Sequence, residues 1–281
     1  MVRRLAYIAA LSCVLAAPAW AGDLLSYEAV YELRLTHASS SGGPRAATGL
    51  YETRFAETCD GWDSKTHTVL NLAFGEGPSV TNERFFSSWE AKTGRDYQFA
   101  AFTLKNGKRV EAYTGTADLG KRGGQARYEV PAAEGNKIEH VTTLKLPQGT
   151  LFPAAHAQAL LSSAEQGGPL FRQVVLNGSS SVGPRVMSTA IGPRRAPGHA
   201  EVAGIDQGLL GTPSWRMSSA YFNLFERRDM PNTEVDLQLY KSGVTESFEQ
   251  TFGDFAVSAK LQRLRRLDAP SFARKASPPA S

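Results

Sequence analysis

The sequence predicts a mostly β protein, a single curled antiparallel sheet that forms a barrel-like structure with one helix near residues 151–166. Two observations predict this fold class. Apolar and polar residues alternate with a period of two through most of the chain, and turn-forming residues recur at short intervals. In addition, only one segment has the composition of a helix. Many strands separated by tight turns are typical of sandwiches, barrels and curled sheets.

The first strand shows the alternation most clearly. Tyr27, Ala29, Tyr31, Leu33 and Leu35 share one face, while mainly polar residues occupy the other. Because successive side chains of a strand point to opposite faces, this segment can cover a core and remain solvated outside. In the first half of the chain, further strands are expected at Gly49–Glu57, Trp62–Phe74, Thr81–Trp89, Asp96–Leu104, Arg109–Thr116, Gln125–Val130 and Lys137–Leu146.

The turns between these strands have recognisable residues. A Ser, Gly and Pro cluster at Ser39–Pro44 predicts a loop, and Cys59-Asp60-Gly61 predicts a turn. The Asn106-Gly107 pair is typical of tight hairpins. In the second half, strands are expected at Leu170–Leu176, Arg185–Ile191, Ser214–Phe225, residues 234–239, Thr245–Phe252 and Phe255–Leu261.

The segment 150–166 is rich in Ala and Leu and is the only helix that the sequence predicts. Thr150 is a candidate N-terminal cap, and Pro153 is tolerated in a first turn. Gly167 suits the position just past the end of a helix.

The N-terminus has the pattern of a secretion signal. Arg3 and Arg4 precede an apolar run, and Ala19-Trp20-Ala21 matches the small-x-small cleavage pattern, so we expect residues 1–21 to be removed. The run is shorter than the roughly 20 residues that span a bilayer, which disfavours an uncleaved anchor. A lipoprotein modified at Cys13 is disfavoured because the apolar run continues past this residue. The sequence thus predicts a periplasmic protein with no integral membrane span after cleavage.

The rest of the chain is expected to be one β domain over residues 22–267, followed by a flexible tail over 268–281 that contains three prolines. Without Arg3 and Arg4, the chain has 29 Lys and Arg against 27 Asp and Glu. This near-neutral balance does not indicate a nucleic-acid partner. The basic run around Arg263, Arg265 and Arg266 is interpreted as a solvated strand end.

The chain has two cysteines, and signal cleavage removes Cys13. Because one thiol cannot form an intrachain disulfide, three states remain open for Cys59: buried and inert, reactive, or paired with another molecule. Burial is the default expectation for a free cysteine.

Catalytic motifs are largely missing from the sequence. The segment Gly178–Gly183 resembles a nucleophile elbow but lacks its spacing, and it is better interpreted as a flexible hairpin loop. The scattered histidines form no metal motif, although they could converge in space. His156 lies in the first turns of the expected helix, where a surface or capping role is favoured over a base or a ligand. The sequence therefore predicts no catalytic, cofactor or metal site.

Aromatic residues recur through the expected strands. Most should fill the core, since inward-facing aromatics of a sheet commonly do so. In a sheet that curls without closing, part of this lining could face a groove that takes an acyl chain or an extended peptide. The residues concerned are Trp62, Phe74, Phe85, Phe86, Trp89, Tyr97, Phe99, Trp215, Tyr221, Phe222 and Phe225.

Three segments carry a resemblance to a known family: GLYETRFAETCDGW at Gly49–Trp62, LPQGTLFPAAHAQALL at Leu146–Leu161, and the stretch Leu237–Leu267. Together they resemble the EipB family of cell-envelope-integrity proteins from the periplasm of alphaproteobacteria. The family-signature residues in this chain are Leu146, Pro147, Gly149, Thr150, Leu151, Phe152, Pro153 and His156.

The resemblance implies a spiral-like, incompletely closed β-barrel, a periplasmic location, a role in resisting envelope stress and no catalytic activity. It also implies a disulfide whose first half matches Cys59. No second cysteine remains after signal cleavage, so the roughly 2–4 kcal/mol that such a bridge contributes must come from packing in this chain.

Three functional hypotheses follow. The first is a non-enzymatic envelope protein that docks a periplasmic protein partner on a sheet edge or in a cleft. The second is a binding module for a lipid or a cell-wall fragment that uses an aromatic-lined cleft. The third is a hydrolase, which requires a Ser or Cys within hydrogen-bond reach of a His that a carboxylate orients inside a pocket.

Overall fold

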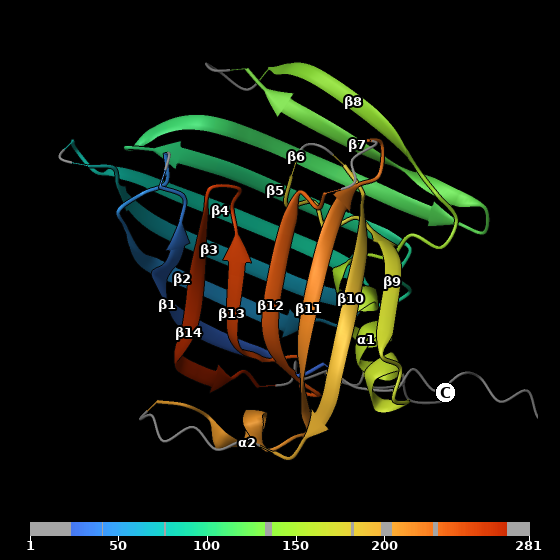
Figure 1. The fold of residues 1–281 in the computed structure, drawn as a ribbon. Coiled ribbons are helices and arrows are strands. Elements are labelled where there is room, and N and C mark those ends of the chain that lie inside the picture. Colours follow the sequence, from blue (N-terminus) through green and yellow to red (C-terminus); the bar gives the residue numbers. More distant parts are fainter. Residues whose placement is uncertain are drawn as a thin grey trace, which may run out of the picture.

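The computed structural model describes residues 24–40, 42–75, 77–132, 137–180, 183–197, 204–226 and 230–268. The expected signal peptide and nearly all of the expected tail lie outside these residues, as does His199. The strands form a single 14-stranded antiparallel sheet that is not closed into a barrel (Figure 1), which confirms the predicted fold class.

The first eight strands are β1 Tyr27–Ala38, β2 Ala46–Glu57, β3 Gly61–Ala73, β4 Val80–Ala91, β5 Asp96–Lys105, β6 Lys108–Gly120, β7 Gly123–Pro131 and β8 Ile138–Leu146. The other six are β9 Leu170–Val175, β10 Arg185–Arg195, β11 Ser214–Asn223, β12 Thr233–Tyr240, β13 Thr245–Thr251 and β14 Phe255–Arg266. Each expected strand is present, and several are longer than the sequence indicates because their ends still pair with neighbours where the alternation fades.

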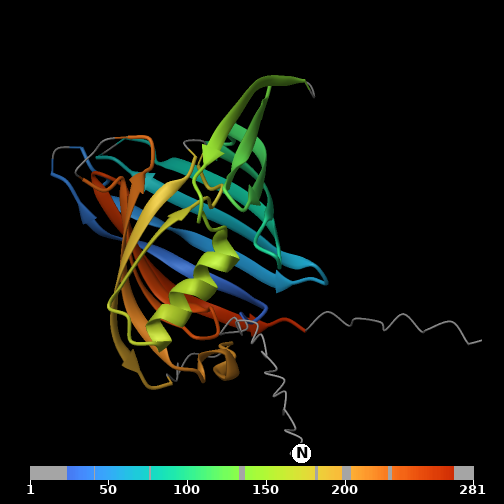
Figure 2. The same cartoon turned by 90° about the vertical axis from the view of Figure 1, so that its right-hand side faces the viewer.

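The order of strands is β8-β7-β6-β5-β4-β3-β2-β1-β14-β13-β12-β11-β10-β9, so the first and last strands pair at the centre while β8 and β9 form the two edges. The expected hairpin between β5 and β6 is confirmed, with Asn106 and Gly107 both at positive φ, as a tight turn requires. Figure 2 shows the sheet curled around helix α1, with the hairpin β7–β8 projecting beyond the body.

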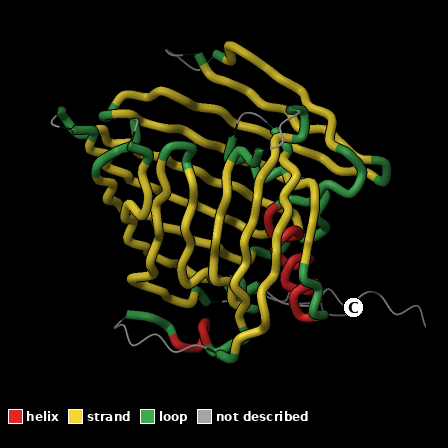
Figure 3. Tube along the Cα trace, in the orientation of Figure 1, coloured by secondary structure: helices red, strands yellow, loops and turns green. Residues whose placement is uncertain are grey.

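Two helices are described (Figure 3): α1 at Pro153–Glu165, which confirms the helix expected near residues 151–166, and α2 at Gln207–Leu210, which the sequence did not predict. Helix α2 has one turn, which is too short to show a helical period. The Asp206 side chain caps it by accepting a hydrogen bond from the Gly208 N–H at 2.9 Å. Leu209 and Leu210 are fully buried. Neither described helix is long and apolar enough to cross a membrane.

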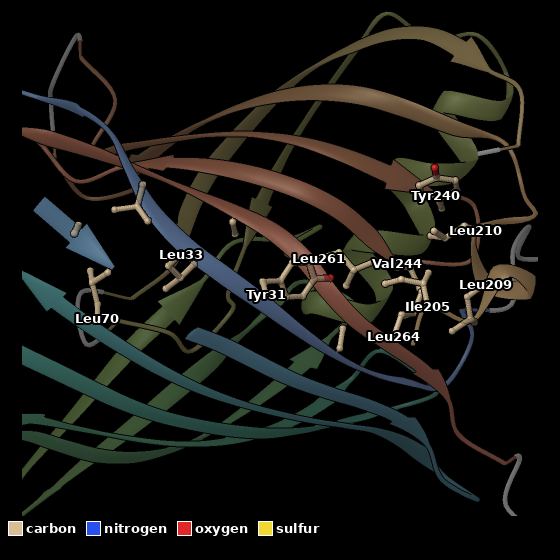
Figure 4. Close-up of a cluster of buried hydrophobic side chains, with 14 of the residues drawn as sticks. Tyr31, Leu33, Leu70, Ile205, Leu209, Leu210, Tyr240, Val244, Leu261 and Leu264 are labelled. Atoms are coloured by element: carbon tan, nitrogen blue, oxygen red, sulfur yellow. The ribbon is translucent and has the colours of Figure 1, made fainter. Parts of the chain in front are cut away.

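The side of the sheet that carries the hydrophobic core is called the inner face here. One core cluster joins the central strands β1 and β14 to α2 and includes Tyr31, Leu209 and Leu264 (Figure 4). A second gathers aromatic residues of β5, β6 and β7. A third packs Leu160 and Leu161 of α1 against strands on opposite halves of the sheet, and thereby fills the space between them.

The expected loop after β9 does join β9 to β10, but its described part is not loosely held. The hydroxyls of Tyr97 and Tyr113 donate to the carbonyls of Asn177 and Gly178, at 2.7 and 3.1 Å. The Arg84 guanidinium donates to the Ser179 carbonyl at 2.7 Å. These bonds tie the loop to the opposite wall of the sheet, so the prediction of a flexible loop was wrong for residues 177–179.

Candidate functional site

A cavity of about 850 Å³ opens on the outer face of the sheet, which is the side away from the core. A neighbouring cavity of about 450 Å³ shares part of its lining and extends to β7. Together they make one trough, called the outer groove here, which crosses β2–β7 and reaches Val30 of β1 and Arg263 of β14 at one end. At about 4.8 Å between strands, the part across β2–β7 is about 24 Å long.

Small side chains floor the outer groove. Ser87, Ala100 and Thr114 lie directly opposite one another on β4, β5 and β6. Larger residues stand on both sides, Phe85 and Phe102 in one row and Trp89 in the other. Because the rows are set by strand register, the hollow runs perpendicular to the strands.

Stacked rings form one wall of the groove. The register places His67, Phe85 and Phe102 side by side on β3, β4 and β5. The ring centroids of His67 and Phe85 are 4.3 Å apart, and those of Phe85 and Phe102 are 4.4 Å apart. Each such pair contributes about 0.5–1.5 kcal/mol beyond its buried area. Phe102 nevertheless remains 39% exposed, which leaves an apolar surface available to a ligand.

Charged groups surround the β1–β3 end of the groove. His67 lies between Glu52 and Glu83, with nitrogen–oxygen distances of 3.3 and 2.8 Å. Within the described part of the chain, Lys65 and Arg263 make no ion pair, and both line the cavity. The groove therefore combines a floor of small residues and an apolar wall with available positive charge at one end.

The inner face carries an ionisable group of a different kind. Glu90 of β4 is 3% exposed, and its carboxylate accepts hydrogen bonds from the N–H groups of Ala154 and Ala155 at 2.6 and 2.9 Å. Burial raises the pKa of Glu90 to about 7. Glu90 thus caps helix α1 from a distant strand, and the prediction that Thr150 caps it was wrong. The hydroxyl of Thr150 instead donates to the carbonyl of Pro147 at 2.8 Å.

The family-signature residues form the crossing from β8 to α1. Leu146 and Phe152 are buried in the aromatic core, and Gly149 has the positive φ of a turn. Leu151 pairs with Val175 of β9. Pro153 begins the helix. The segment therefore carries the chain from one edge of the sheet to the other.

His156 is 7% exposed, so the prediction of a surface or capping histidine was wrong. Burial lowers its pKa to about 4, and its Nε2 atom has no hydrogen-bond partner among the described residues. Its ring lies 5.7 Å from that of Phe171. His156 lies on the buried side of α1, where its neutral imidazole packs beside Phe171 of β9.

Cys59 is exposed, so the default expectation of burial was wrong. It lies in the turn between β2 and β3, where the N–H of Gly61 donates to the hydroxyl of Thr58 at 3.0 Å. The Cys59 thiol therefore faces solvent.

Among the described residues, the side-chain hydrogen bonds shown for histidines go to Glu52, Glu83 and Thr142, and none goes to a Ser or Cys. The described residues also contain no group of three or more His, Cys, Asp or Glu placed to hold a metal ion. Of the predicted aromatic lining, Phe85 and Trp89 face the outer groove, whereas Phe99 lies in the aromatic core and Phe86 packs against it. The outer groove is therefore the candidate site.

Comparisons with known proteins agree with this architecture. The model of a family described as EipB-like matches residues 18–268. The chain is 28% identical over 257 residues to the cell envelope integrity protein EipB of Brucella abortus (strain 2308), covering 89% of this chain and 86% of that protein. The crystal structure of a beta-barrel-like protein with a domain of unknown function from Brucella abortus has a TM-score of 0.78 and 24% identity, covering 88% of this chain and 100% of that chain. The structural match shows the fold, and the sequence matches confirm the resemblance.

Proposed function

The chain belongs to the EipB-like family, and from this premise we propose that it is a non-enzymatic periplasmic protein that supports the integrity of the cell envelope. The name of its Brucella relative supports the envelope role. The signal-like N-terminus supports the periplasm as the compartment. The outer groove is the observation that supports this mode of action, since the stacked rings of Phe85 and Phe102 offer an exposed apolar surface to a partner.

The occupant that fits the groove is a segment of a periplasmic protein. An open trough on a sheet face contacts one side of a bound segment, as grooves for helices and extended peptides do. The floor of Ser87, Ala100 and Thr114 gives room for a segment, and Phe85 and Phe102 offer apolar contact. Lys65 complements an acidic side chain at one end. We therefore expect a partner with apolar residues flanked by an acidic one.

A lipid or cell-wall fragment is the second candidate, which the apolar wall of Phe85 and Phe102 favours. Its binding would bring an acyl chain along Ala100 and Phe102, with an anionic group at Lys65. Native mass spectrometry of the protein after incubation with envelope lipids distinguishes the two, because a bound lipid adds a discrete mass.

The test is complementation of a deletion strain with Phe102→Asp and with the control Phe252→Asp. Both phenylalanines are partly exposed, at 39% and 45%, and each stacks on one neighbouring Phe, but only Phe102 lines the groove. We expect the Phe102 variant to leave the strain sensitive to detergent and cell-wall antibiotics, and the control to restore resistance. Restoration by both variants at equal protein levels would refute the role of the groove. An unchanged deletion strain would refute the envelope role itself.

A further inference from the structure

Buried polar atoms without a partner gather at one place on the inner face. Within the part of the chain that the structure describes, four buried side-chain atoms have no hydrogen-bond partner: the Tyr128 hydroxyl, Arg185 Nε, Asn223 Oδ1 and His156 Nε2. Since roughly 90% or more of buried polar groups in native proteins are paired, each exception requires an explanation. His156 belongs to helix α1, and the other three residues form a group of their own.

Strand register places Arg185 beside Asn223. Arg185 begins β10 and Asn223 ends β11, where the two residues are directly opposed. Residues opposed in this way share a face, with Cβ atoms about 4.5–5.5 Å apart. The face is the inner one, since Met187, two residues along β10 from Arg185, is buried. The Asn223 amide donates to Glu226 Oε1 at 2.6 Å, which turns its own carbonyl oxygen away from that carboxylate.

Tyr128 approaches this pair from the opposite wall of the curled sheet. It is 3% exposed and belongs to the aromatic core of β5–β7. The start of β10 reaches this wall, because a Cβ atom on Gly183 would lie 2.5 Å from Leu144, which packs against the same core. Burial and the neighbouring Tyr113 raise the pKa of Tyr128, while the Arg185 guanidinium is near enough to lower it. The unpartnered hydroxyl therefore lies in the field of Arg185.

The positive charge of Arg185 is uncompensated within the described residues. Arg185 is half-buried and makes neither an ion pair nor a hydrogen bond there. The charge of Arg84, by contrast, is matched by Glu111 at 2.7 Å. Removal of a cation from water is costly unless a counter-charge or hydrogen-bond acceptors replace the water. A bound anion would supply both.

We propose that Arg185, Tyr128 and Asn223 bind a phosphate group that carries a proton. The guanidinium and the phenol donate to phosphate oxygens, and the planar fork of arginine donors matches phosphate. The carbonyl oxygen of Asn223 can only accept, so it pairs with the P–O–H group of the protonated phosphate. Sulfate and carboxylate have no such hydrogen at neutral pH, and the set of donors and acceptor therefore favours phosphate over both.

This site is separate from the outer groove. None of Arg185, Tyr128 and Asn223 lines either cavity of the groove. The inference is therefore independent of the proposed function, and the failure of one leaves the other standing. Inorganic phosphate and a phosphate monoester both offer the required group.

Isothermal titration calorimetry of the processed full chain tests the proposal with sodium phosphate, glycerol 3-phosphate and sodium sulfate. The titrations are made at matched ionic strength and at about pH 6, where both phosphates retain a proton in a large part of the population. We expect wild type to bind inorganic phosphate, and sulfate about tenfold more weakly or less, because Asn223 Oδ1 then faces an oxygen without hydrogen. Binding of glycerol 3-phosphate as well assigns the site to phosphate monoesters, and binding of inorganic phosphate alone assigns it to the free anion.

Two variants test the residues. Tyr128→Phe removes only a hydroxyl that has no partner, so the variant should fold and bind phosphate about tenfold more weakly. Arg185→Gln should abolish measurable binding. The matched control is Arg172→Gln, which removes an exposed guanidinium from the other face of the adjacent strand β9 and should leave binding unchanged. Circular dichroism verifies that each variant is folded.

Three results would overturn the proposal. The first is a wild type that binds no phosphate up to about 10 mM. The second is equal affinity for phosphate and sulfate. The third is wild-type affinity in folded Tyr128→Phe and Arg185→Gln.

Discussion

Glu90 and His156 are two buried ionisable groups at the start of α1, and substitution of Glu90 by Gln tests how they share the pH dependence of stability. The Gln side chain keeps one acceptor for the helix N–H groups but cannot ionise. We expect it to lose one of the two hydrogen bonds, which costs about 1 kcal/mol at all pH values.

The magnitude follows from the two pKa values. The pKa of Glu90 rises from 4.5 in an unfolded chain to about 7, so the folded protein binds this proton more tightly and becomes less stable as pH rises through this window, by about 3 kcal/mol. The pKa of His156 falls from 6.5 to about 4, so the unfolded chain binds this proton more tightly. Stability is then lost as pH falls from about 6.5 to about 4, again by about 3 kcal/mol.

The two contributions to the free energy of unfolding have opposite signs. In the wild type, this pair should therefore make the stability depend only weakly on pH. In Glu90→Gln only the histidine contribution remains. The free energy of unfolding of the variant, relative to wild type, should rise by about 3 kcal/mol between about pH 4 and about pH 8.

Urea unfolding monitored by tryptophan fluorescence measures this difference. His156→Gln is the matched counterpart, and its difference from wild type should change in the opposite direction, rising as pH falls. A difference between Glu90→Gln and wild type that is constant over the whole range would refute the reasoning.

Three further predictions concern packing and exposure. Tyr113→Phe removes the hydroxyl that donates to the Gly178 carbonyl and should lower the free energy of unfolding by about 1 kcal/mol in urea titrations; no change would show that the loop is held otherwise. Gly115→Ala would place a Cβ atom 2.2 Å from the ring of Phe99 and should cost about 1–3 kcal/mol, whereas the control Gly77→Ala, whose nearest contact is 3.6 Å, should be near neutral. The thiol of Cys59 should react with a maleimide in the folded protein, and labelling that requires urea would contradict its exposure.

The strands could be predicted because one face of the sheet is buried and the other is solvated. Tyr31 and Leu33 are buried as their alternation indicates, and Glu32 between them is not. The backbone conformation of a tight turn also depends on the turn residues themselves. The Asn106-Gly107 pair therefore predicted the hairpin correctly. Local patterns therefore determine most of this fold.

The missed features depend on contacts between distant segments. Glu90 caps a helix more than sixty residues away, and no local pattern marks such a partner. The outer groove arises from the register of several strands, which puts small side chains in one row and rings in the next. The sequence suggested an aromatic-lined cleft inside the curled sheet. On the inner face of the sheet, that space is filled by α1 and by residues 177–179.

The pairing of β1 with β14 also determines when the protein can finish folding. β14 is the last of the described strands to be synthesised, yet it lies in the middle of the sheet beside the first strand. Before β14 pairs, the sheet can form only as two halves, each with an unpaired edge strand. Joining the halves brings together residues from almost opposite ends of the chain, and contacts of such long sequence separation form slowly. We therefore expect folding to finish only after β14 has been synthesised. Truncation before β14 should leave the sheet divided at its centre.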